Sequence, residues 1–189
     1  MFYYKAALSG VKNYIEELVY SIDEFGSNDF EYIISHDLNS NNLFVNSKYR
    51  LIRWLFQLRY LLWKQVVLPL KLYLKNIDYV VCPDYLSPIL TNSKKIIVIH
   101  DNLFWKYPEN YPELWRKYFT FLIKLGICSK SLIVTTSNYS KDGLKQIFKK
   151  NPIFPIYQSS ESLKFKIENN HKKKYILHLG TFEKRKDLL

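Results

Sequence analysis

Short apolar runs alternate with longer segments of helical periodicity along this chain, and that alternation constrains its fold more than any other feature. The runs are rich in β-branched and aromatic residues, which favour strands. They lie at 32–35, 79–82, 96–100, 132–136, 154–157 and 175–179. Each run is nearly continuous in apolar residues, a pattern typical of parallel strands that are covered on both faces.

The segments between the runs predict helices at 10–25, 113–127 and 138–149, because apolar residues recur in them at helical spacing. Ser137 stands where its hydroxyl would cap the third of these helices. Alternating strands and helices predict an α/β fold with a doubly wound, Rossmann-like parallel sheet. Ligands of such sheets bind beyond the carboxyl ends of the strands.

Composition favours a folded protein with an anionic partner. The chain has 189 residues, 48% of them hydrophobic and 17% aromatic, with a formal net charge of +11. Such a composition suits a packed core and attracts phosphate or an anionic membrane surface.

We expect a first domain over 1–157, a polar linker over 158–174 and the truncated start of a second domain over 175–189. No run reaches the roughly 18 apolar residues of a membrane span, and no signal peptide is visible, so we expect a cytoplasmic protein.

The segment 48–75 combines basic and aromatic residues and contains no acidic residue. One interpretation is a helix with one face on the sheet and a solvated basic face. Another is a helix in the interface of a membrane, which would place the protein on the inner face of the plasma membrane. It assigns to the membrane surface Arg50, Arg53, Trp54, Arg59, Trp63 and Lys64. Pro69 is expected to kink or end this helix. We expect no nucleic-acid partner, because no nucleic-acid module accompanies the charge.

Two groups of residues stand where a ligand of this fold would bind. His100 and Asp101 end the run at 96–100, so the histidine can donate to a substrate hydroxyl or phosphate, and the aspartate can orient it. Backbone amides at Gly10 offer an anion site at a helix start. Arg185 and Lys186, which follow a strand and a glycine, offer cations for the same kind of ligand.

No metal-ligand spacing surrounds the cysteines Cys82 and Cys128, which we interpret as small buried hydrophobic residues. No phosphate loop and no nucleophile elbow is present either. We therefore expect neither a metal nor a tightly bound cofactor.

Four blocks of the sequence together resemble the retaining glycosyltransferases of family 4. The segment 9–18 (SGVKNYIEEL) looks like the glycine loop and first helix of that family. Segments 63–69 (WKQVVLP) and 78–83 (DYVVCP) are similar to the region before its third or fourth strand. Segments 97–103 (IVIHDNL) and 132–144 (LIVTTSNYSKDGL) resemble its His-Asp strand end and the helix start that follows. Segment 177–188 (LHLGTFEKRKDL) resembles the opening of its donor-binding domain.

This resemblance implies the N-terminal half of a GT-B fold. The implied activity moves a sugar from a nucleotide-sugar donor to a cell-surface polysaccharide or lipid-linked acceptor, without a metal. It places His100 and Asp101 at the transferred sugar, Gly10, Arg185 and Lys186 at the donor diphosphate, and Ser137 in an acceptor or structural role. The donor-binding domain is almost wholly missing, and the segment 2–8 is a poor match to the family's first strand. The implied protein is thus a fragment that is inactive alone. Two alternatives are a non-catalytic membrane-surface or glycan-binding remnant and a decayed gene product.

Overall fold

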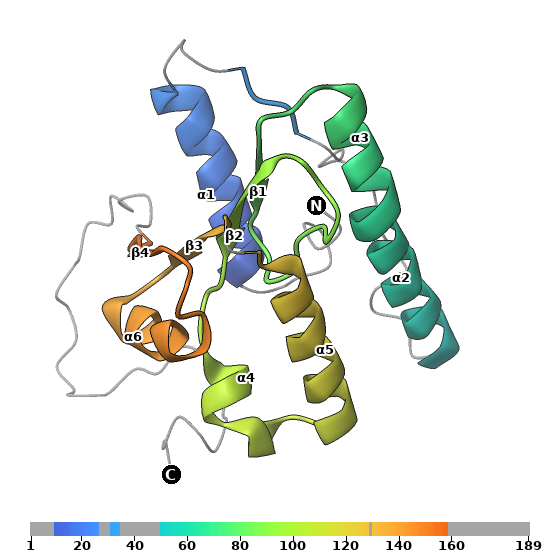
Figure 1. Cartoon of the computed structure of the whole chain (residues 1–189), viewed down its shortest axis with the longest axis vertical. Coiled ribbons are helices and arrows are strands. Elements are labelled where there is room, and N and C mark those ends of the chain that lie inside the picture. The colour runs from blue at the N-terminus through green and yellow to red at the C-terminus, as the bar shows by residue number, and fades with distance from the viewer. Residues whose placement is uncertain (1–9, 27–30, 35–49, 129, 159–189) are drawn as a thin grey trace, which may run out of the picture. The chain divides into compact units, whose positions relative to one another are not determined.

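The structure, a computed structural model, describes residues 10–26, 31–34, 50–128 and 130–158. These residues all belong to one compact unit, Met1–Ser159 (Figure 1). Apart from Gln158, the predicted linker and the predicted start of a second domain lie outside the described residues. The same holds for Arg185 and Lys186 and for the side chains of Arg50 and Arg53.

Four parallel strands form the sheet of the described region. They are β1 (Tyr79–Cys82), β2 (Lys94–Val98), β3 (Leu132–Thr135) and β4 (Ile153–Pro155). Their order in the sheet is β1-β2-β3-β4, so it follows the order of the chain. Val81 pairs with Ile96, and Val134 pairs with Phe154. The prediction of an α/β fold with a parallel sheet is confirmed.

The predicted strand at 32–35 is wrong for the part that the structure describes. Tyr32, Ile33 and Ile34 have no regular secondary structure, and all three side chains are exposed. β-propensity reflects how well a residue fits a half-buried pleated surface. These apolar residues lack that surface, so their composition alone does not make them a strand.

The three helices predicted at 10–25, 113–127 and 138–149 are present, with ends that agree to within two residues. The helices of the described region are α1 (Gly10–Phe25), α2 (Arg50–Leu62), α3 (Leu68–Leu74), α4 (Leu103–Lys106), α5 (Glu113–Gly126) and α6 (Asn138–Ile147), with a short 3₁₀ turn η2 (Pro108–Asn110). Ser137 caps α6, because its Oγ accepts a hydrogen bond of 3.1 Å from the amide of Ser140. That part of the prediction is confirmed.

A π-helical turn, η1 (Trp63–Val67), joins α2 to α3. Inside it the amide of Leu68 donates to the carbonyl of Trp63, five residues back. The three elements together run from 50 to 74 and are called the long helix below. The expected break at Pro69 does not occur. Pro69 lies in the first turn of α3, directly after the π-helical turn in which the α-helical hydrogen-bond pattern is already interrupted.

One hydrophobic cluster holds these elements together. Alternate strand residues such as Cys82, Ile97 and Ile133 are fully buried in it. The long helix adds Leu68 and Leu72, and further buried residues are Ile123 of α5 and Leu144 of α6. Val98 and Val134, which strand alternation points to the other face of the sheet, are also buried. The carboxyl ends of the strands are therefore fixed by burial on both faces.

Candidate functional site

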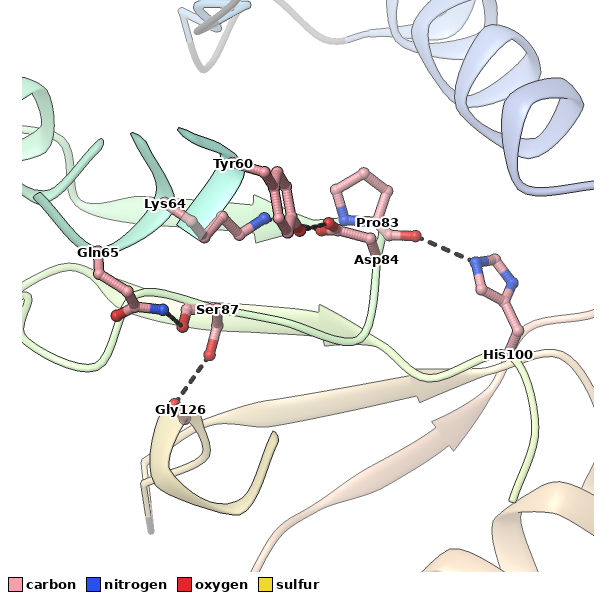
Figure 2. A network of polar contacts seen from close by, with 8 residues as sticks. All are labelled: Tyr60, Lys64, Gln65, Pro83, Asp84, Ser87, His100 and Gly126. Atoms are coloured by element: carbon pink, nitrogen blue, oxygen red, sulfur yellow. Dashed lines mark hydrogen bonds and ion pairs between the residues drawn. The ribbon is translucent and has the colours of Figure 1, made fainter. Parts of the chain in front are cut away.

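Residues that follow three neighbouring strands meet at the carboxyl edge of the sheet. Pro83 follows β1, His100 lies just beyond β2, and Thr136 follows β3. The Nε2 atom of His100 lies 3.0 Å from the carbonyl oxygen of Pro83 (Figure 2). The hydroxyl of Thr136 donates to the backbone carbonyl of His100 at 2.9 Å. The histidine is thus held by both neighbouring strand ends.

The surroundings of His100 keep its ring neutral. The ring of Tyr14, from α1, lies edge-on to it at 5.0 Å, and the ring of Tyr85 lies at 6.0 Å. Burial lowers the pKa of His100 and outweighs the opposite effects of the Pro83 carbonyl and of Asp101. A carbonyl oxygen only accepts hydrogen bonds, so Nε2 carries the proton and Nδ1 is left as an acceptor. The sequence suggested that His100 donates to a ligand, whereas the neutral ring has only an acceptor nitrogen left.

Asp101 is bonded to residues other than His100. Its Oδ1 accepts from the amide of Leu103 at 3.1 Å, at the start of α4. Its carboxylate also accepts a hydrogen bond from the hydroxyl of Tyr85, whose pKa is raised by burial and by that negative charge. The ring hydrogen bond of His100 goes to Pro83. Pro83 therefore holds the imidazole in place, a role that the sequence suggested for Asp101.

A buried ion pair supports the loop that carries Pro83. The Nζ of Lys64 lies 2.7 Å from Asp84, and the Tyr60 hydroxyl also donates to this carboxylate (Figure 2). Burial by itself would lower the pKa of Lys64, but the charge of Asp84 and the hydrogen bond between them raise it. Lys64 is only 5% exposed. Its predicted place at a membrane surface is wrong, because an ammonium group stays buried where a carboxylate and hydrogen bonds compensate it.

The far end of the same loop connects the long helix to α5. Gln65 donates to the carbonyl of Ser87 at 3.1 Å and accepts from the amide of Ile89 at 2.9 Å. Ser87 in turn donates to the carbonyl of Gly126 at 2.9 Å (Figure 2). A Cβ atom on Gly126 would lie 2.6 Å from the Ser87 hydroxyl, so only glycine allows this close approach. The loop is thus fixed at both ends.

The other predicted site residues lie in different places. Gly10 is the first residue of α1. Backbone amides at the start of a helix have no partner within the helix. Trp54 and Arg59 are exposed on α2, whereas Trp63 is partly buried against the core. Cys82 is buried as expected, but Cys128 is exposed, which corrects its interpretation as a core residue.

Sequence reasoning missed several residues around His100. Tyr14, Pro83, Tyr85 and Thr136 all contact it. Pro83 and Thr136 directly follow strands β1 and β3, and Tyr85 lies three residues after β1, so the rule that ligands bind at strand ends could have identified them. Tyr14 lies far away in sequence, and no local pattern marks it. The site is thus an imidazole at the carboxyl edge of the sheet, surrounded by the rings of Tyr14 and Tyr85.

The described residues contain no group of three or more His, Cys, Asp or Glu side chains that could hold a metal ion. None of the helices described is both long and apolar enough to cross a membrane. Comparisons with protein-family models, with curated proteins and with solved structures find no match to this chain. The function therefore has to be argued from the site itself and from the sequence resemblance.

Proposed function

We propose that this chain is the acceptor-binding half of a retaining glycosyltransferase, with the doubly wound N-terminal domain of a GT-B fold. Its reaction moves a sugar from a nucleotide-sugar to a cell-surface polysaccharide or lipid-linked acceptor. The observation that carries the proposal is the neutral His100 at the carboxyl edge of a parallel sheet, held by Pro83. Its free Nδ1 is a suitable acceptor for a sugar hydroxyl.

In the proposed reaction the acceptor hydroxyl attacks the anomeric carbon from the side of the leaving group. The bond between that carbon and the phosphate oxygen breaks, and the proton of the acceptor passes to the departing diphosphate. Charge builds up on the diphosphate, and preorganised cations and amides stabilise such charge. Gly10, Arg185 and Lys186 are assigned to this group. His100 contacts the transferred sugar, and Asp101 keeps Tyr85 and the start of α4 in place.

Saturation-transfer NMR with a panel of nucleotide-sugars and alkyl glycosides tests this proposal on the full chain. We expect saturation of the sugar protons with the native chain. With His100→Ala the signal should fall at least severalfold, while the thermal midpoint changes little. The exposed α6 residue Tyr139 offers the control Tyr139→Ala, which should bind as the native chain does. Absence of binding by every ligand, or equal binding by His100→Ala, would refute the assignment.

Activity provides a separate test of the half-enzyme. Because the role proposed for this chain is to bind the acceptor, we expect the purified chain to show no transfer or hydrolysis of nucleotide-sugars above background. Turnover at an ordinary enzymatic rate by the purified chain would contradict the claim that a second half is required, though it would support a sugar site.

A further inference from the structure

The long helix presents an apolar stripe to solvent on the side opposite its buried residues. Its buried residues Tyr60, Lys64, Leu68 and Leu72 recur every fourth position. The residue two positions after each buried one is apolar and exposed. In a helix, residues two positions apart lie on nearly opposite sides. The stripe is made of Leu51, Leu55, Leu62, Val66, Leu70 and Leu74, each at least half exposed. A contiguous apolar surface of this kind marks an interaction site.

A second exposed apolar stripe lies on α5. It consists of Leu114, Tyr118, Phe121 and Leu125, at helical spacing. The carboxyl end of α5 is bonded through Ser87 to the loop that also binds Gln65 of η1. Because both bind this loop, the carboxyl end of α5 lies near η1, and both helices expose apolar side chains to a partner.

The charges around the stripes indicate what that partner is. The long helix contains no acidic residue; Arg59 and Lys71 are exposed on it, and Lys75 is exposed directly after it. On α5 the acidic residue is Glu113, which is paired with Lys117 at 2.6 Å. A second copy of this chain would bring like charges together, and a nucleic acid offers no partner for leucines. An anionic bilayer surface matches both the cations and the apolar side chains.

We propose that the long helix, extended by α5, docks on an anionic membrane surface with its axis in the plane of the interface. Leucine and valine side chains enter the boundary between headgroups and acyl chains, and the cations bind lipid phosphates. This docking does not depend on the proposed transferase activity. The sequence suggested that a basic face with Lys64 contacts the lipid. In this proposal the contact is made by the apolar stripe, with cations beside it, and Lys64 lies inside the protein.

Co-sedimentation with vesicles tests this surface. The full chain is mixed with vesicles of phosphatidylcholine plus phosphatidylglycerol, or of phosphatidylcholine alone. We expect binding to the anionic vesicles that weakens with added salt, because basic residues near such a surface are screened within a Debye length. Binding that is absent, or equal on both vesicles and insensitive to salt, would overturn the proposal.

A pair of matched variants identifies the surface. Leu62→Gln/Leu70→Gln removes two stripe residues that are 54% and 56% exposed, and we expect binding to weaken about tenfold or more. The control, Phe25→Gln/Ile156→Gln, changes two apolar residues that are 76% and 56% exposed outside the stripe, and it should bind as the native chain does. Equal loss in both variants would show nonspecific hydrophobic binding and overturn the assignment. So would a dimer in solution that only the stripe variant dissociates, because the occupant would then be a second copy.

Tryptophan fluorescence tests the same surface without a polar substitution. Trp54 is exposed on the lipid-facing side of α2 in this proposal. We expect a blue shift of the native emission on addition of anionic vesicles, and a smaller shift for Trp54→Phe at an unchanged thermal midpoint. An identical shift in the two proteins would contradict the proposed orientation.

Discussion

The two sides of the long helix contrast sharply in what they carry. The inner side buries the cation of Lys64 between Tyr60 and the sheet, and the outer side leaves Leu62, Val66 and Leu70 in solvent. A partition by hydropathy alone would place these residues the other way round. Lys64 is inside because Asp84 lies 2.7 Å away. The comparison teaches that the partner of a side chain, more than its own polarity, decides where it lies.

Removing the buried cation should have the largest effect on stability. Lys64→Met leaves the partly buried carboxylate of Asp84 without its cation, and breaking such a pair costs up to about 3–5 kcal/mol. Denaturant unfolding followed by circular dichroism measures the loss. Lys75→Met, at the exposed position that directly follows the same helix, should change stability by less than about 0.5 kcal/mol. Similar losses in both variants would show that the inner cation has no special role.

The same contrast can be tested with leucines alone. Leu68→Ala opens a cavity in the core and should cost about 2–5 kcal/mol. Leu70→Ala, two positions away but exposed, should stay within about 0.5 kcal/mol of the native chain. The two free energies of unfolding are compared under one set of conditions. Equal values would mean that the inner and outer sides are not distinct in solution.

Loss of the Tyr60 hydroxyl should have a smaller effect. Tyr60→Phe keeps the ring in the core but removes the hydrogen bond to Asp84, which should cost about 0.5–1.5 kcal/mol. In the background of Lys64→Met the same change should have a different cost, because the two residues share one carboxylate. A double-mutant cycle measures this coupling, and strict additivity would contradict a shared network.

The pH dependence of stability should show the smallest effect. The pKa of His100 is lowered by burial in the folded state, so below about pH 6.5 the unfolded chain binds a proton that the folded chain does not. Stability should therefore fall as the pH decreases through this region. The fall should be shallower in His100→Gln, measured by unfolding at a series of pH values. A steeper or unchanged slope in the variant would indicate that the histidine is charged in the fold.

Local patterns predicted much of this fold but little of the site. The runs at 79–82 and 132–136 and the helix at 10–25 are nearly the strands and helix observed, because burial on both faces and helical spacing are local signals. Ser137 was found from its place before a helical segment. The pairing of Lys64 with Asp84 joins positions 20 residues apart, and only the folded chain brings them together.

The contacts of His100 show the same limit. Its position at a strand end follows from the sequence, but its hydrogen bond to Pro83 depends on the register between β1 and β2. The edge contact with Tyr14 depends on where α1 packs. Composition likewise does not decide that Tyr32 lies outside the sheet. In each case the position of a side chain depends on residues far away in the sequence, so the local sequence around it does not predict its contacts.

The π-helical turn η1 has a consequence for how this gene can change. Residues before and after it, such as Tyr60 and Leu68, share the inner side. Gaining one codon between 63 and 67 would rotate everything that follows by about 100°, so Leu68 and Leu72 would leave the core and part of the outer stripe would turn inward. Losing one codon would instead bring the buried positions to the three- and four-residue spacing of an ordinary α-helix, so the inner side would be kept. Insertions in this turn are therefore expected to be tolerated far worse than deletions or substitutions.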